Sequence, residues 1–294
     1  MSERALDPIG VFDSGVGGLD VAAELARALP SERLVYIGDT ARVPYGTRTP
    51  EEVLRFTREA AWALVERGVK AVVLACNTAS AVALEALSGE LPVPVLGMVG
   101  AGLAAAEEWA RAEERREGGG AGAVLVLATP GTVNSSAYQR ALAAARPGRA
   151  VYALACPLFV PLVEEGWASR PISALITAEQ FKRLAPLERP EAPIGAALLG
   201  CTHYPLMREA ISAGLVSALG REVPLLDGAR EVPRQLAALL SARGLLAPPT
   251  GAPRQHALYT TSDPARVAEL AARFWRARVG APLPPIMTCA LAPA

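Results

Sequence analysis

Length, composition and charge exclude several classes of protein. The 294 residues carry 29 basic and 29 acidic side chains, so no net charge attracts the chain to nucleic acid or to an anionic membrane. The four cysteines lie far apart in no disulfide or zinc-binding pattern, and no apolar stretch approaches the length that spans a bilayer. These features predict a cytoplasmic protein of two domains that binds no metal, nucleic acid or membrane.

Strand-like and helix-like segments alternate along the first third of the chain. Apolar strands are expected at 9–12, 34–37 and 69–75, separated by helices at 19–29 and 51–67. Continuous apolar strands between helices are typical of a parallel sheet with helices on both faces.

The same alternation restarts after a glycine-rich break at 118–122. Further strands are expected at 124–128, 150–155 and 194–199. The spacings between strand ends are 26 and 37 residues in the first half and 27 and 45 in the second. The residues at these ends are, in order, Asp13, Asp39, Cys76, Thr129, Cys156 and Cys201. The simplest interpretation is an internal duplication, although any α/β protein has apolar strands at about this spacing.

We therefore expect an α/β fold of two similar open parallel-sheet lobes, pseudo-two-fold related, with a cleft between them. The first lobe is expected to comprise 1–98 and 207–294, and the second 99–206. A late helix is expected at 264–279, and the Pro- and Ala-rich tail at 280–294 is expected to be peripheral or mobile.

Two cysteines each lie where an apolar strand meets a helical segment. Ligands of open α/β sheets bind beyond such strand ends, and a helix N-terminus there favours the thiolate form. Cys76 and Cys201, facing one cleft, would take a proton from one side of a carbon and return one to the other. The alternative for each is a small buried hydrophobe, which is our interpretation of Cys156; Cys289 belongs to the tail.

Polar neighbours give these thiols a chemical setting. Asp13 lies in a glycine-rich turn, where a helix N-cap is its alternative role, and His203 is close enough to Cys201 to tune or relay its proton. Asn77, Thr78 and Thr202 are candidate donors to a substrate carboxylate.

No cofactor is expected. The loop Gly15–Gly18 matches neither a dinucleotide-binding nor a P-loop pattern. A pyridoxal-phosphate enzyme needs a Schiff-base lysine, and neither Lys70, before a strand, nor Lys182, in a polar helix, is placed for that role.

A family resemblance accounts for these motifs together, and they cover most of the chain in the family's order. They are GVFDSGVGGL (10–19), GDTARVPYG (38–46), ACNTASA (75–81), ATPGTV (128–133), CPLFVPLVE (156–164) and LGCTHYPL (199–206). In them the chain resembles the cofactor-independent aspartate/glutamate racemase family.

The resemblance implies a reaction and a set of roles. It implies interconversion of L- and D-glutamate by Cys76 and Cys201 as acid/base groups, with Asp13, His203 and Glu164 assisting. The residues implied to bind the amino acid are Ser14, Asp39, Tyr45, Gly46, Asn77, Thr78, Thr132 and Thr202. It also implies a homodimer that supplies D-glutamate for bacterial peptidoglycan.

Departures from the family pattern and rival functions remain. Asp20 replaces the usual threonine, Val99-Gly100 a Glu-Pro pair, and Gly228 a serine, which puts packing or regulation in doubt more than chemistry. A racemase or isomerase of aspartate, a hydantoin or a maleate-like diacid is one rival. A non-catalytic amino-acid-binding protein and a dithiol redox protein are the others.

Overall fold

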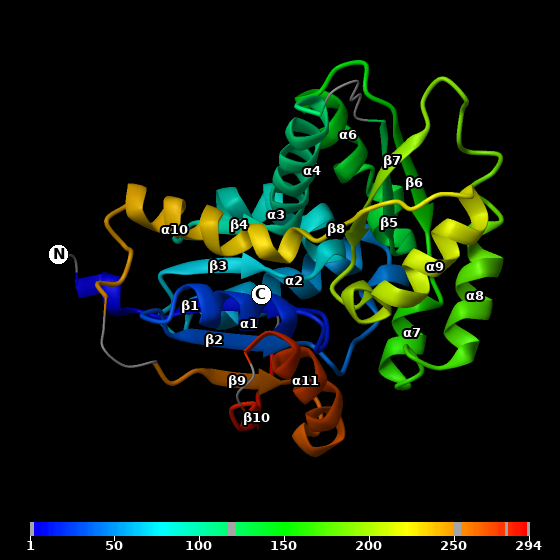
Figure 1. Ribbon diagram of the computed structural model, residues 1–294. Helices are drawn as coiled ribbons and strands as arrows, with labels where there is room; N and C mark the ends of the chain where they lie inside the picture. The colour runs from blue at the N-terminus through cyan, green and yellow to red at the C-terminus, as the bar shows by residue number, and fades with distance from the viewer. Residues whose placement is uncertain (1–2, 117–121, 250–253, 280–281, 293–294) are drawn as a thin grey trace. The chain divides into compact units, whose positions relative to one another are not determined.

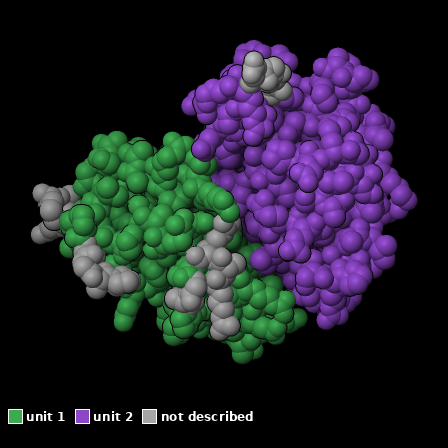
Figure 2. All heavy atoms as spheres, in the orientation of Figure 1, with its two compact units in different colours: residues 1–98, 229–294 green, residues 99–228 purple. Residues whose placement is uncertain are grey.

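The computed structural model divides into two compact units. Unit 1 comprises Met1–Met98 with Ala229–Ala294, and unit 2 comprises Val99–Gly228 (Figure 2). The structure describes residues 3–116, 122–249, 254–279 and 282–292. Most of the glycine-rich break expected at 118–122 lies outside these residues. Among the described residues, no helix has the length and apolarity needed to cross a membrane.

Unit 1 is built on a parallel sheet of six strands in the order β10-β9-β2-β1-β3-β4 (Figure 1). The strands are β1 (Ile9–Asp13), β2 (Leu34–Gly38), β3 (Ala71–Leu74), β4 (Val95–Gly97), β9 (Ala257–Thr260) and β10 (Ile286–Thr288). The strands β1, β2 and β3 are buried along their whole length, as expected for continuous apolar runs in a covered sheet.

Helices of unit 1 bury the two faces of this sheet. Helix α1 packs against α10 and α11, and α2 packs against α3. Their bounds, with those of the 3₁₀ helices, are η1 (Glu3–Leu6), α1 (Leu19–Ala28), η2 (Tyr45–Thr47), α2 (Pro50–Val65), α3 (Asn77–Glu90), η4 (Gly228–Glu231), α10 (Val232–Ala242) and α11 (Pro264–Val279).

Unit 2 is built on a parallel sheet of four strands in the order β6-β5-β7-β8. The strands are β5 (Ala123–Ala128), β6 (Val151–Ala155), β7 (Ile194–Gly200) and β8 (Leu225–Leu226). The helices are α4 (Met98–Glu114), α5 (Pro130–Ser135), α6 (Ala137–Ala145), α7 (Phe159–Glu164), α8 (Pro171–Phe181), η3 (Tyr204–Met207) and α9 (Arg208–Leu219).

The two sheets share one strand order. The run β2-β1-β3-β4 in unit 1 has the topology of β6-β5-β7-β8 in unit 2. The predicted α/β class with two parallel-sheet regions is confirmed. In each run the second strand along the chain lies on one side of the first strand, and the third strand lies on the other side. The position between the first and third strands is the topological switch point, where open α/β sheets bind ligands. The carboxyl ends of β1 and β3, and of β5 and β7, are therefore the places to look for a site.

Two segments differ from the sequence expectation. Residues 207–228, expected in the first lobe, lie in unit 2, because β8 pairs with β7 and α9 packs against α8. The tail, expected to be peripheral, adds β10 to the sheet edge beside β9, and Cys289 N donates to Thr260 O at 2.9 Å. An open strand edge with unpaired backbone groups accounts for this addition.

Candidate active site

Asp13 is the last residue of β1 and lies at the switch point of unit 1. Gly15 N donates to Asp13 Oδ2 at 2.9 Å, and Asp13 is fully buried. A Cβ at Gly18 would lie 2.5 Å from the Cβ of Asp13 and 3.0 Å from that of Ala75, so only glycine fits there. The glycine-rich loop thus serves close packing of the turn against the end of β3.

Cys76 lies two residues after β3 and is the N-cap of α3, with Ala79 N donating to its sulfur at 3.5 Å. Cys76 Sγ also lies 3.4 Å from Ser14 Oγ. A backbone N–H and the positive end of a 14-residue helix both stabilise negative charge on sulfur. Asn77 and Thr78, in the first turn of α3, are buried beside the thiol.

The side chain of Asp39 is hydrogen-bonded to two residues of the loop after β2. Asp39 is fully buried and accepts hydrogen bonds from Tyr45 Oη at 2.5 Å and Arg42 Nε at 2.6 Å. Burial, and next the neighbouring Asp39 charge, raise the pKa of Tyr45, so it remains a phenol. Gly46 follows directly and is also buried.

Cys201 directly follows β7 in unit 2 and has a different setting from Cys76. It is followed by a turn and the 3₁₀ helix η3 rather than by an α-helix that it caps, contrary to the expectation that both cysteines open helices. Its sulfur lies 3.9 Å from His203 Nδ1. His203 Nε2 lies 3.2 Å from Glu164 Oε1 at the end of α7. Unit 2 therefore aligns a thiol, an imidazole and a carboxylate.

The imidazole in this line is held in its charged form. Burial lowers the pKa of His203, but hydrogen bonds to Cys201 and Glu164 raise it more, to about 10. With both ring nitrogens protonated, His203 donates toward sulfur on one side and toward the carboxylate on the other. The Cys201 sulfur therefore lies beside a cation.

Hydroxyl groups line the rest of this edge of unit 2. Thr129 caps α5, and its Oγ1 lies 3.0 Å from Thr132 Oγ1. Thr202 Oγ1 lies 3.5 Å from His203 Nδ1.

Cys156 is fully buried at the end of β6, and burial raises its pKa. These features fit its interpretation as a structural cysteine.

Each unit thus gathers its own share of the predicted residues. Unit 1 gathers Asp13, Ser14, Asp39, Tyr45, Gly46, Cys76, Asn77 and Thr78, and unit 2 gathers Thr132, Glu164, Cys201, Thr202 and His203. Sequence reasoning did not single out Glu59 or Thr261, both of which join the Asp39 cluster. The polar run Thr260-Thr261-Ser262 at the end of β9 was the signal available for the second.

Comparison with known proteins decides the family. The family model described as Asp/Glu/Hydantoin racemase matches residues 9–236. The chain belongs to the Asp/Glu/Hydantoin racemase family. Membership confirms the family predicted from the motifs and places the chain among racemases.

Relatives in this family match along nearly the whole chain. The glutamate racemase of Geobacter metallireducens is 42% identical over 272 residues, covering 92% of this chain and 94% of that protein. That of Thermus thermophilus is 45% identical over 267 residues, covering 91% and 92%. The crystal structure of the Francisella tularensis glutamate racemase in complex with D-glutamate has a TM-score of 0.81 at 31% identity, covering 97% of this chain and 98% of that one.

Two departures from the family pattern have local explanations. Asp20, where threonine is usual, lies in the first turn of α1, where the helix dipole favours a carboxylate. At Gly228, where serine is usual, a Cβ would lie 2.9 Å from the backbone nitrogen of Gly102. The glycine permits this close approach of two backbone segments within unit 2.

Proposed function

We propose that this protein is a glutamate racemase that interconverts L- and D-glutamate with Cys76 and Cys201 as its two bases. The observation that supports this most is that each unit carries a cysteine at the switch point of an equivalent sheet, with its own means of stabilising a thiolate. The proposal requires the two sulfurs to address the substrate α-carbon from opposite sides.

The proton transfers balance without any other reactant. In one direction the thiolate of one cysteine takes the α-proton, and the electron pair of the broken C–H bond stays on carbon, delocalised into the α-carboxylate. The thiol of the other cysteine then donates its proton to the opposite face and becomes the thiolate. The enzyme ends each turnover in the protonation state that accepts the product enantiomer.

In this scheme, neighbouring groups stabilise the thiolate or assist proton transfer at each cysteine. The α3 N-terminus stabilises the thiolate of Cys76, whose thiol form donates to Ser14 Oγ, and Asp13 is proposed to assist proton transfer on that side. His203, oriented by Glu164, does so for Cys201. Fixed donors near the substrate carboxylates lower the cost of the carbanionic transition state.

Binding is proposed to use polar groups at the strand ends. The proposed substrate-binding residues are Ser14, Asn77, Thr78, Thr132, Thr202 and the loop that contains Tyr45 and Gly46, which Asp39 supports. We further propose a homodimer whose product serves peptidoglycan synthesis, since the family resemblance implies both, and a cytoplasmic location. Sedimentation velocity on the purified chain tests the dimer, and D-glutamate auxotrophy on deletion tests the cellular role.

The central test is loss of the α-proton in D₂O. With L-glutamate and no pyridoxal phosphate, we expect the α-proton signal to disappear from the NMR spectrum as optical activity decays to zero. Cys76→Ala and Cys201→Ala are each expected to abolish racemisation, because each removes one of the two bases. Cys289→Ala serves as the matched control and is expected to keep wild-type activity. Racemisation by either active-site variant contradicts the two-base scheme.

A further inference from the structure

The carboxylate of Asp39 is fully engaged by the protein. Arg42 Nε and Tyr45 Oη donate to Oδ2, and Thr261 Oγ1 donates to Oδ1 at 2.9 Å. Asp39 is 0% exposed. A substrate would have to displace these partners to reach the carboxylate. Asp39 therefore holds neighbouring residues of the site in place rather than binding the ligand.

Arg42 ties this carboxylate to helix α2. Its NH1 forms an ion pair with the buried side chain of Glu59, and its guanidinium carbon lies 4.2 Å from the centroid of the Phe56 ring. Burial lowers the pKa of Arg42, but the hydrogen bond to Glu59 and the charge of Asp39 raise it overall, so the cation persists. A guanidinium held by two carboxylates and a ring has a fixed orientation.

The tyrosine of the loop is an anchor. Tyr45 is 1% exposed, and its ring lies 6.1 Å from that of Phe12 and 5.7 Å from that of Phe56. Its hydroxyl is committed to Asp39. The side chain therefore fixes the place of the next residue, Gly46, which is also buried.

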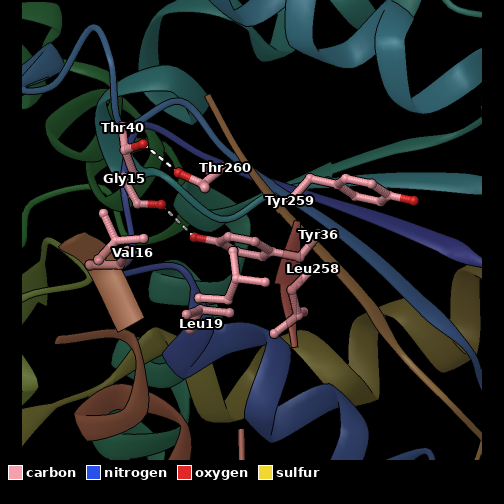
Figure 3. Close-up of a pocket in the computed structure, with 11 residues that line it drawn as sticks. Gly15, Val16, Leu19, Tyr36, Thr40, Leu258, Tyr259 and Thr260 are labelled. Carbon is pink, nitrogen blue, oxygen red and sulfur yellow. Dashed lines mark hydrogen bonds between the residues drawn. The ribbon is translucent and has the colours of Figure 1, made fainter. Parts of the chain in front are cut away.

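A segment from the far end of the chain completes the network. Thr261 N donates to Gly38 O at 3.1 Å, and Ala41 N donates to Thr261 Oγ1 at 3.0 Å. Beside it, the hydroxyls of Thr40 and Thr260 form a hydrogen bond at 2.5 Å. Figure 3 marks this bond with a dashed line. The hydroxyl of Thr261 thus bridges the carboxylate of Asp39 and the backbone of the loop after β2.

We infer that Thr261, together with the Arg42–Glu59 pair, is a positioning residue that fixes Asp39 and thereby the loop Val43–Gly46. This inference rests on the proposed function, in which that loop binds glutamate. Loss of the Thr261 hydroxyl leaves Asp39 Oδ1 and the Ala41 amide without their hydrogen bonds. The loop then becomes less ordered, and substrate binding weakens more than the proton transfers slow.

Three variants test the role of the hydroxyl. Thr261→Val removes it at constant shape, and Thr261→Ser restores it. Thr57→Val is the matched control, because Thr57 is a buried threonine of the same unit whose hydroxyl donates to Val53 O within α2. Two readouts are measured for each, namely the steady-state constants for glutamate and the hydrogen–deuterium exchange of the amides in 43–47.

Thr261→Val is expected to raise KM for glutamate about five- to tenfold, with kcat changed less than about twofold, and to speed exchange in 43–47 about tenfold. Thr261→Ser and the Thr57→Val control are expected to behave like the wild type. Unchanged loop exchange or unchanged KM in Thr261→Val overturns the inference, as does a serine variant as impaired as the valine. If the wild type does not act on glutamate, the proposed function fails, while loop exchange still decides whether Thr261 orders the loop.

Discussion

The two candidate cysteines have different neighbours. Cys76 has the backbone amide of Ala79 and a helix N-terminus, whereas Cys201 has the imidazole of His203. Neighbours in sequence suggested His203. Its partner Glu164 lies 39 residues away along the chain; the family resemblance named Glu164 but did not predict this pairing. Local sequence cannot reveal a contact made by a separate helix.

Glu164→Gln is expected to lower the pKa of His203 below its wild-type value of about 10 and to slow racemisation roughly tenfold. The amide keeps a hydrogen-bonding oxygen but loses the charge that holds the imidazolium. An NMR titration of the histidine ring measures the pKa. The neighbouring, exposed Glu165→Gln is the control and should leave both quantities unchanged; equal pKa values in the two variants contradict the pairing.

The same histidine predicts a difference in alkaline stability. Its pKa is higher in the folded protein than the ordinary value of about 6.5, so the stabilisation is full below that pH. The stabilisation is lost as pH rises through about 10. In urea unfolding from pH 7 to 10, the free energy of unfolding should fall more steeply for the wild type than for Glu164→Gln. Parallel curves would mean that the charge pair contributes nothing to folding.

His256 predicts the opposite pH dependence. Its Nδ1 accepts from Leu34 N at 3.2 Å, and burial lowers its pKa. The stabilisation is present above the ordinary histidine pKa and is lost as pH falls through the lower folded value. Between pH 7 and 5, the free energy of unfolding measured with urea should therefore fall less in His256→Ala than in the wild type. A loss of equal size in both proteins would contradict this role.

Among the elements, the turn between β1 and α1 depends most on one residue. Gly18→Ala is expected to destabilise the protein by about 1–3 kcal/mol and to reduce activity, because its Cβ would displace Asp13. Gly89→Ala is the control, since nothing lies within 4 Å of its Cβ position in α3. It should stabilise the protein by up to about 1 kcal/mol. Thermal unfolding compares the two, and equal effects would rule out the crowding at Gly18.

Elements with strong patterns were predicted and those made by pairing alone were not. The continuous apolar composition of β1, β2 and β3 predicted these strands. Strand β10 did not, because Ile286–Thr288 sits in a Pro-rich tail and becomes a strand only beside β9. The two-residue β8 likewise exists only through its pairing with β7.

At the scale of the whole of unit 1, one buried ion pair joins distant parts of the chain. Lys70 Nζ lies 2.5 Å from Glu32 Oε2 and donates to Ala5 O at 2.6 Å. The other oxygen of Glu32 accepts from Ala247 N at 2.9 Å. The pair thus links η1, the loop before β2, the start of β3 and the segment after α10.

Lys70→Met is expected to destabilise the protein by about 3–5 kcal/mol, because it leaves Glu32 charged and unpaired in the interior. The double variant Lys70→Met with Glu32→Gln should recover at least half of that loss. Urea unfolding of the wild type and the two variants measures the free energies. A double variant as unstable as the single one would show that Lys70 acts by packing and not by charge.

The internal duplication was the most informative prediction at this scale. The overlay of strand ends paired Asp13, Asp39 and Cys76 with Thr129, Cys156 and Cys201, and the sheets place the same strands in the same order. The second crossing of the chain between units was placed too early, because α9 and β8 have no feature that marks their unit. Only their packing and pairing show it.

The most direct test of the two-base proposal is where deuterium appears early in the reaction. In D₂O with L-glutamate, mass spectrometry of the separated enantiomers should find deuterium at Cα in nearly all new D-glutamate and in almost none of the remaining L-glutamate. The reason is that the second thiol, equilibrated with solvent, delivers the new hydrogen. D-glutamate that retains the original protium would contradict the account, because it would mean that one base both removes and returns the same proton.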